Sequence, residues 1–299
     1  MSKLKPSVFT GVATAMITPF RGGVIDYESL SALIEFQIAN EADAIVIAGT
    51  TGEASTLTDE EYRDLIRFAV EKTDGRVPVI AGSGSNCTEK ACRLSRIASD
   101  AGADACLVVT PYYNKATQRG LAESYRHIAA CGKPIILYNV PSRTGMRISI
   151  DTYEELSKVE NIVAVKEADT DISNTAELIF RCGDALDIYT GNDSELIPVL
   201  ALGGAGVISV ASNLIPSEMR SICRSFLGGN CAEARRNFAA VFPLIRALFS
   251  EVNPIPVKTA LSLRGFCEEE FRLPLCSMEE KKREALRALL DRYFQPANG

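Results

Sequence analysis

Short apolar segments recur at even intervals along the first two thirds of this chain, and helix-like segments separate them. Eight of these segments are predicted to be strands, at residues 12–17, 44–48, 77–81, 105–109, 134–138, 162–166, 185–190 and 206–210. Strands that are apolar along their whole length are typical of a parallel sheet whose two faces are both covered. The number of strands and their even spacing predict an α/β fold, a closed (β/α)₈ barrel.

An open, doubly wound sheet is the alternative to a closed barrel. A nucleotide-binding sheet of that kind carries Gly-x-Gly-x-x-Gly after an early strand. The nearest match, Gly82-Ser-Gly-Ser-Asn-Cys87, lacks the third glycine. The helices between the strands begin with ordinary signals, Asp26 as an N-cap and Thr58 with Glu61 as a capping box. We therefore favour the barrel.

Beyond about residue 215 the strand pattern stops and only helices are predicted. Their expected positions are residues 216–227, 230–249, 254–263 and 278–293. Gly228-Gly229 is a helix stop, and Asn253-Pro254 is expected to be an N-cap and first-turn pair. The chain is thus predicted to consist of a barrel that carries the site, residues 1–214, and a helical appendage, residues 215–299, packed on it without a flexible linker.

Composition excludes several classes of function. The net charge of −6 and the pI of about 5.1 argue against a nucleic-acid or anionic-membrane partner. No apolar stretch reaches membrane-spanning length, and the first residues lack the apolar core of a signal peptide. The nine cysteines are scattered without a Cys-x-x-Cys pair. They are expected to be reduced thiols of a cytoplasmic protein, not a disulfide framework or a zinc site.

His127 is the single histidine of the chain. A His-based metal site lacks its second imidazole, so no metal is expected. His127 follows Glu123-Ser-Tyr-Arg in a predicted helix, away from any strand end, which disfavours a Ser-His-Asp or Cys-His mechanism. The chemistry must then use lysine, tyrosine, threonine, arginine or carboxylate groups.

Lys166 ends the apolar run from Ile162 to Val165. In a (β/α)₈ barrel the carboxyl ends of the strands form the active-site face. An amine held against apolar side chains loses solvation of its charged form, so it can attack a carbonyl carbon and form a Schiff base. The ordinary alternative is a lysine that ends a strand and reaches solvent.

The other predicted strand ends carry residues with reactive or binding side chains. Each has an ordinary interpretation, as a helix cap, as turn filling or as a surface charge. A barrel brings them all to one rim, however, and this convergence favours a functional Lys166. The residues are Thr50, Thr51, Tyr112, Tyr113, Tyr138, Arg143, Gly191, Ile208 and Ser209.

Five motifs in order resemble the dihydrodipicolinate synthase family, which belongs to the pyruvate-dependent class I lyases together with N-acetylneuraminate lyase. The resemblance covers essentially the whole chain, including Asn253-Pro-Ile-Pro-Val-Lys258 in the helical part. The motifs are Gly49-Thr-Thr-Gly-Glu53, Pro111-Tyr-Tyr-Asn114, Tyr138-Asn-Val-Pro-Ser-Arg-Thr-Gly145, Val165-Lys-Glu167 and Gly191-Asn-Asp193.

The resemblance implies a role for each of these residues. Lys166 would form the Schiff base with pyruvate, and Tyr138 would donate and accept protons. Thr50 and Tyr113 would complete a hydroxyl relay, with Tyr113 reaching in from a neighbouring subunit. The pyruvate pocket would be formed by Thr51, which holds the carboxylate, with Gly191 and the backbone at Ile208. The resemblance also implies no cofactor and a homotetramer made of two dimers, or at least a dimer.

Arg143 distinguishes the possible substrates. In the resembled synthases an arginine here binds the carboxylate of aspartate semialdehyde, and the product is 4-hydroxy-tetrahydrodipicolinate of lysine and diaminopimelate biosynthesis. The related sugar-acid lyases generally lack this arginine, so another pyruvate-dependent aldolase is the second reading. A barrel that only binds a ligand is the third, and it would be expected to have lost Lys166 or Tyr138.

Family members that L-lysine inhibits bind it at the dimer interface, with a glutamate that receives its ammonium group. Lys90 occupies that place here, and a cation repels an ammonium group. Glu89 is next in sequence but lies about 100° round the helix, so it is not expected to substitute. We therefore expect insensitivity to L-lysine. The positions that match the pocket are Ala54, Ser55, Asp59, Tyr62, Asn86, Lys90 and Tyr112.

Overall fold

Eight parallel strands close into a barrel in the computed structural model of this chain, which describes residues 5–130 and 132–294. The strands follow the order β1-β10-β9-β8-β7-β6-β5-β4 around the barrel, and β4 pairs with β1 to close it. The prediction of a closed barrel is confirmed. The barrel strands are β1 (Gly11–Ala15), β4 (Ala44–Ile47), β5 (Val79–Gly82), β6 (Ala105–Val109), β7 (Ile135–Asn139), β8 (Ile162–Glu167), β9 (Asp187–Thr190) and β10 (Gly206–Ser209).

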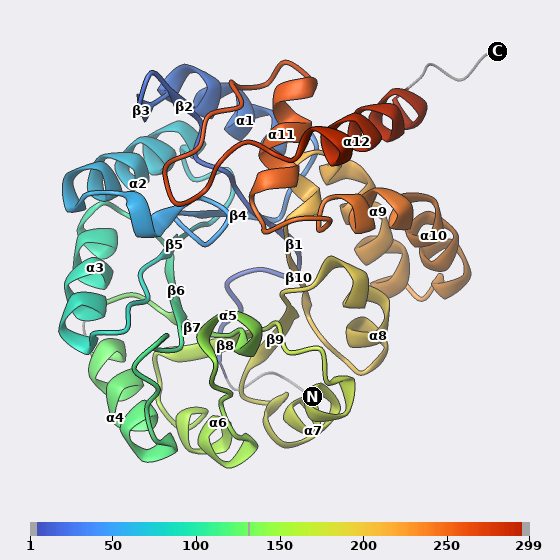
Figure 1. Cartoon of the computed structure of the whole chain (residues 1–299). Helices are drawn as coiled ribbons and strands as arrows, with labels where there is room; N and C mark the ends of the chain where they lie inside the picture. The colour runs from blue at the N-terminus through green and yellow to red at the C-terminus, as the bar shows by residue number, and fades with distance from the viewer. Residues whose placement is uncertain (1–4, 131, 295–299) are drawn as a thin grey trace.

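Helices surround the strands as an outer ring, which Figure 1 shows with the strands at its centre. The predicted N-cap is confirmed, because the Asp26 carboxylate accepts from the Ser29 N–H. The capping box of Thr58 and Glu61 is confirmed in both directions. The ring consists of α1 (Tyr27–Ala39), α2 (Asp59–Thr73), α3 (Thr88–Asp100), α4 (Gln118–Ala129), α6 (Ile150–Leu156), α7 (Ile172–Cys182), α8 (Leu196–Ala201) and α9 (Pro216–Leu227).

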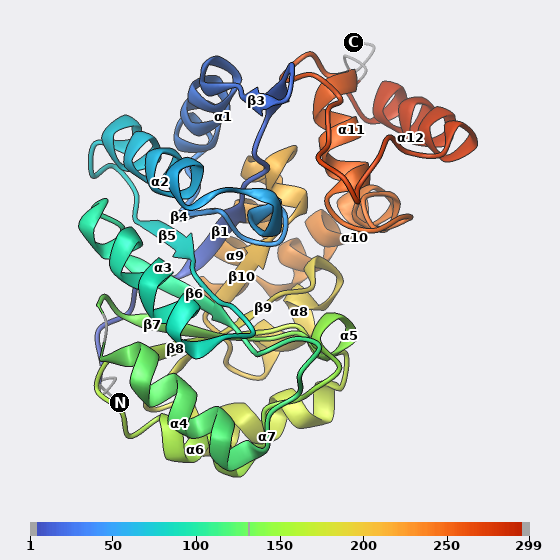
Figure 2. The same cartoon turned by 60° about the vertical axis from the view of Figure 1, so that its left-hand side comes forward.

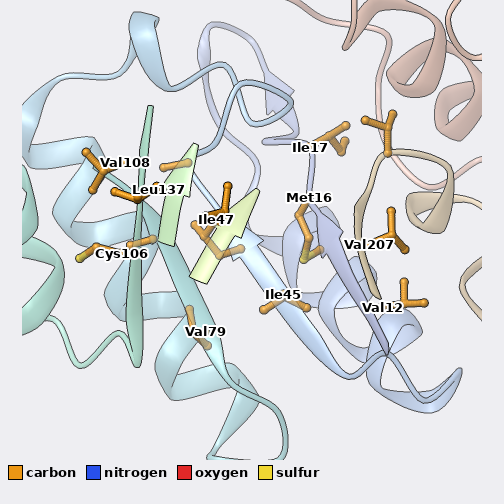
Figure 3. Close-up of a cluster of buried hydrophobic side chains, with 14 of the residues drawn as sticks. Val12, Met16, Ile17, Ile45, Ile47, Val79, Cys106, Val108, Leu137 and Val207 are labelled. Carbon is orange, nitrogen blue, oxygen red and sulfur yellow. The ribbon is translucent and has the colours of Figure 1, made fainter. Parts of the chain in front are cut away.

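Alternate residues of each strand belong to two separate apolar layers. Along β4, Ile45 and Ile47 pack with the helices while Val46 faces the inside of the barrel. This is the period of two that a strand imposes on its side chains. Figure 3 shows part of the outer layer, with Val79 from β5 and Leu137 from β7. The barrel interior is therefore filled, and only the ends of the strands are open to a ligand.

The last third of the chain contributes α9 and three further helices, α10 (Cys231–Ala247), α11 (Ile255–Leu263) and α12 (Glu280–Tyr293). Figure 2 shows these three gathered on one side of the barrel. The helix predicted at 216–227 is confirmed, and it packs against β1. The division of the chain between residues 214 and 215 stays a prediction. The end of another helix, predicted near residue 131, lies outside the described residues.

The N-cap predicted at Asn253 is wrong. The helix α11 begins after Pro254, and no side chain caps it. The Asn253 amide instead donates from Nδ2 to the Oγ1 atom of Thr51 at 3.0 Å. The Asn253 side chain therefore binds a residue that is distant in the sequence instead of capping the helix that follows it.

The shortest elements of the fold were not predicted. A hairpin of β2 (Phe20–Arg21) and β3 (Val24–Ile25) lies between β1 and α1, and the single turn α5 (Pro141–Thr144) follows β7. Elements of two to four residues show too little of a period to be recognised in a sequence. One of them, α5, carries Arg143 to the rim of the barrel.

Candidate active site

Lys166 and Tyr138 lie side by side at the carboxyl ends of two neighbouring strands. They are register partners between β7 and β8. The Nζ atom of Lys166 is 4.4 Å from the centroid of the Tyr138 ring. Both side chains are buried, with 5% and 7% of their surfaces exposed. An amine in contact with the face of an aromatic ring, inside an apolar barrel, is in the surroundings expected of a lysine nucleophile.

Gly191 gives the Lys166 side chain the room that it occupies. A Cβ atom at this position would lie 2.9 Å from Lys166 Cε and 2.7 Å from the Ala168 Cβ atom. Any larger residue would displace the lysine. The Gly191 N–H also donates to the Glu167 carbonyl at 2.6 Å, which fixes the end of β9 against β8. The structure thus places Gly191 next to Lys166, as the convergence of strand ends predicted.

Asp193 brings a fully buried carboxylate to the same place. Its Oδ2 atom accepts from the backbone N–H groups of Val210 at 3.0 Å and Ala211 at 2.9 Å. Burial raises the pKa of Asp193, while these hydrogen bonds and the charge of Lys166 oppose that rise. This aspartate belongs to the motif Gly191-Asn-Asp193, but no role was predicted for it. Its position two residues after Gly191, at a predicted strand end, was the feature from which a place in the site could have been predicted.

A cavity of about 320 Å³ lies beside Tyr138, and its lining includes neither Lys166, Gly191 nor Asp193. Thr50 from the turn after β4, Tyr138 from β7 and Arg143 from α5 all line it. Segments far apart in the sequence therefore meet at one rim, as predicted. The same cavity extends to Lys90 and Tyr112.

The turn that carries Thr50 and Thr51 is anchored by a buried ion pair. Glu53 and Lys258 are in contact, and both side chains are fully buried. The second Glu53 oxygen accepts from the Arg272 N–H at 3.1 Å, and Lys258 also donates to the Glu270 carbonyl at 2.9 Å. Burial lowers the pKa of Lys258, and the charge of Glu53 opposes that shift. The helical region therefore holds one side of the cavity in place.

Arg143 is exposed at the mouth of the cavity. Its Nη2 atom donates to the main-chain oxygen of Asn253 at 3.1 Å. A guanidinium group has five N–H donors, so this contact leaves others for a ligand carboxylate. The position fits the binding role that the resemblance implied.

Tyr113 and Ile208, two further predicted site residues, lie in opposite surroundings. Tyr113 is 91% exposed and does not line the cavity of its own chain. Its φ angle of 71° is in the left-handed region, which few non-glycine residues adopt. Ile208 is fully buried and belongs to the inner apolar layer together with Tyr138. It is thus inside the barrel, whereas Tyr113 extends away from it.

Glu167 follows Lys166 and fixes the outer side of the same strand. Its carboxylate accepts from Asn139 Nδ2 at 2.7 Å, from the Asp169 N–H at 2.8 Å and from the Tyr153 hydroxyl at 2.9 Å. Burial raises its pKa to about 7 despite these hydrogen bonds. This network was not predicted, because its partners come from a strand, a loop and a helix.

The lysine pocket expected from the resemblance is part of the same cavity. Lys90 lines it, whereas the neighbouring Glu89 pairs with His127 at 3.4 Å between Oε1 and Nε2. Glu89 thus points away from the cavity, as the helix geometry predicted. Asn86 is not among the lining residues. Those that line it are Ala54, Ser55, Asp59, Tyr62, Lys90 and Tyr112.

Among residues 5–130 and 132–294, no three His, Cys, Asp or Glu side chains come together as a metal-ion site. In the same part of the chain, no helix has both the length and the apolar character needed to cross a bilayer.

The fold and the site together define a class of protein, the (β/α)₈ barrels with a buried lysine at the carboxyl ends of their strands. A model of the dihydrodipicolinate synthetase family matches residues 8–293. The chain belongs to this family, and the resemblance found in its motifs is confirmed.

Individual relatives agree with the family match. The chain is 50% identical over 288 residues to the 4-hydroxy-tetrahydrodipicolinate synthase of Thermoanaerobacter sp. (strain X514), covering 96% of this chain and 97% of the relative. It is 49% identical over 291 residues to the synthase of Acetivibrio thermocellus, with 97% and 99% covered. The crystal structure of dihydrodipicolinate synthase from Aquifex aeolicus has a TM-score of 0.94 at 47% identity, with 97% of this chain and 100% of that one covered.

Proposed function

We propose that this chain is a lyase that condenses pyruvate with L-aspartate-4-semialdehyde through a Schiff base on Lys166. The product is 4-hydroxy-tetrahydrodipicolinate, an intermediate of lysine and diaminopimelate biosynthesis. The observation that carries the proposal is the buried contact between Lys166 Nζ and the Tyr138 ring at the carboxyl ends of β8 and β7. Relatives about half identical over nearly the full chain support the choice of substrates.

The chemistry follows from the amine. Lys166 adds to the keto carbon of pyruvate, and loss of water gives a protonated imine. The imine withdraws electrons, so the pyruvate methyl group loses a proton and an enamine forms. The enamine carbon attacks the aldehyde carbon, whose oxygen takes up a proton. The amino group of the second substrate then attacks the imine carbon, closes the ring and displaces the lysine amine.

Protons must move at every step, and Tyr138 is the group placed to carry them. It lies over the amine and lines the cavity that also contains Thr50. We assign Thr50 and the Tyr113 of a neighbouring subunit to the relay that connects Tyr138 with solvent. The protonated imine itself is the electron sink, so the proposed reaction needs neither a cofactor nor a metal.

The two substrates carry carboxylates, and two residues are assigned to them. Thr51, with Gly191 and the backbone at Ile208, forms the proposed pyruvate pocket beside Lys166. Arg143 binds the carboxylate of the semialdehyde at the cavity mouth, because a guanidinium group pairs with a carboxylate through two parallel hydrogen bonds. No role for nucleic acid or membrane is proposed for this acidic chain.

We propose a homotetramer of two dimers as the working assembly, with at least the dimer required. The 91% exposure of Tyr113 supports the view that its side chain serves another subunit. We also propose that the enzyme works in the cytoplasm. Among the residues that the structure describes, the cysteines form no disulfide with one another, which is usual in a reducing compartment.

Two assays distinguish the proposed function from that of a sugar-acid lyase with the same fold. Purified protein is given pyruvate with aspartate semialdehyde, and separately N-acetylneuraminate, while pyruvate is measured. We expect pyruvate to be consumed in the first reaction and none to be released in the second. Release of pyruvate from the sugar acid, without condensation, would assign the chain to the other branch.

A further inference from the structure

Asn253 is in contact with both residues that are assigned to substrate carboxylates. Its side-chain Nδ2 atom donates to Thr51 Oγ1 at 3.0 Å, and its main-chain oxygen accepts from Arg143 Nη2 at 3.1 Å. Asn253 is 9% exposed and Thr51 is 3% exposed, so water does not compete for the first contact. No described group of the chain donates to the Asn253 Oδ1 atom. Most buried polar atoms in folded proteins have a hydrogen-bond partner, so one without a partner calls for an explanation, and a role at a functional site is one of them.

The direction of the Asn253–Thr51 hydrogen bond has a chemical consequence. A threonine hydroxyl has one O–H donor and two lone pairs. The Asn253 N–H group occupies a lone pair of Thr51, so the Thr51 O–H must point elsewhere. A carboxylate can only accept hydrogen bonds. The Asn253 contact therefore leaves Thr51 with the polarity that an anionic ligand requires.

We propose that Asn253 is a positioning residue that orients the Thr51 hydroxyl to donate to the pyruvate carboxylate. The inference rests on the proposed function, because it takes pyruvate as the ligand of Thr51. Arg143 is held by the main chain of Asn253 and not by its side chain. Side-chain substitutions at this position therefore change the pyruvate site and leave the semialdehyde site intact.

Two substitutions distinguish this role from simple packing. Asn253→Ala removes the donor, and the Thr51 hydroxyl is then free to rotate. Asn253→Asp keeps the shape, but a carboxylate accepts from Thr51, so the hydroxyl turns toward it and presents lone pairs to pyruvate. If Asn253 only fills space, the isosteric Asp variant should be the milder one. If it orients Thr51, the Asp variant should be the more severe.

The measurement is the pyruvate concentration that half-saturates borohydride trapping, with KM for the semialdehyde and kcat recorded beside it. We expect Asn253→Ala to weaken pyruvate binding about two- to tenfold, which is the value of one net hydrogen bond. Asn253→Asp should weaken it by about a further tenfold or more, because charged groups are involved. KM for the semialdehyde should change less than about twofold in both, as for an independent site.

Asn237→Ala is the matched control. Asn237 lies in α10, and its Nδ2 atom donates to the Ser221 hydroxyl at 3.0 Å, the same kind of contact at the same length. It should leave pyruvate binding unchanged. In the background of Thr51→Val, Asn253→Ala should have no further effect, because the hydroxyl on which it acts is gone.

The proposal is overturned if Asn253→Asp is milder than Asn253→Ala, or if Asn237→Ala weakens pyruvate binding as much. Should the Ala variant not fold, unchanged pyruvate binding in Asn253→Asp alone overturns it. If the wild-type protein forms an adduct on Lys166 and the Asn253 variants bind pyruvate normally, only the role of Asn253 is contradicted. Wild-type protein that forms no adduct removes the proposed function as well.

Discussion

At the scale of a single residue, Arg143 is the side chain proposed to select the second substrate. Arg143→Ala should lose condensation with aspartate semialdehyde and still form the pyruvate adduct, because Lys166 and Thr51 are untouched. Removing one partner of a buried charge pair costs about 2–5 kcal/mol, and because Arg143 is exposed we expect a loss near the lower figure. Steady-state kcat/KM for the semialdehyde is the quantity to measure. An unchanged value would show that Arg143 is misassigned, and Arg119→Ala, at an exposed position in α4, is the neutral control.

Glu167 makes the stability of the fold depend on pH. Its folded-state pKa of about 7 is above the ordinary glutamate value near 4.3, so between these values the folded chain holds more of the proton than the unfolded chain does. This contribution to stability is complete below about pH 4 and is lost as the pH rises through about 7, with a total of about 4 kcal/mol.

Glu167→Gln carries no such charge and should remove this pH dependence. Urea unfolding at matched protein concentration, from pH 5 to pH 8, is the measurement that compares it with the wild type. We expect the difference between the two proteins to grow in favour of the variant as the pH rises. Parallel curves would contradict the assignment. Glu123→Gln, on the exposed side of α4, should follow the wild type.

Single residues differ in how far the sequence reveals them. Lys166 was predicted because a local pattern, an apolar strand with a lysine at its end, marks it. Asp193 and Asn253 were missed because their roles depend on partners elsewhere in the fold. The Asn253 side chain contacts a residue 202 positions away, and no local rule contains that information.

At the scale of elements, α3 carries the two residues from which we predict the response to L-lysine. It presents Lys90 to the cavity and turns Glu89 toward His127. We expect the wild-type enzyme to be insensitive to L-lysine, because two cations about 4 Å apart repel by about 1 kcal/mol in water and about 4 kcal/mol in a partly buried site. Inhibition assays of wild type and Lys90→Glu test this, and the variant should gain sensitivity. Strong inhibition of the wild type at sub-millimolar lysine would contradict it.

Elements were predicted well where a period was long enough to be recognised. The eight barrel strands are present, and their ends lie within two residues of the predicted ones. The α5 turn was missed because four residues carry no period, yet it places Arg143. The N-cap of α11 was predicted wrongly, because the Asn253 side chain binds Thr51 instead of capping the helix.

At the scale of the whole molecule, the site is proposed to be complete only in an assembly. If Tyr113 serves a neighbour, each site takes Lys166 from one chain and Tyr113 from the other. The variants Lys166→Ala and Tyr113→Phe can then complement each other in a mixed dimer. Co-expression of the two variants should then restore activity to about a quarter of the wild-type value, because half of randomly formed dimers are mixed and each holds one intact site. Each variant alone is the control. No recovery in the mixture would show that Tyr113 acts within its own chain or not at all.

The account as a whole depends on a covalent bond between pyruvate and one lysine. The direct measurement is borohydride reduction in the presence of pyruvate, followed by mass spectrometry of the intact chain and of its peptides. We predict a mass increment of one reduced pyruvate on the peptide that contains Lys166, and none in a Lys166→Arg variant. Labelling of another lysine such as Lys258, or of none, would contradict the mechanism.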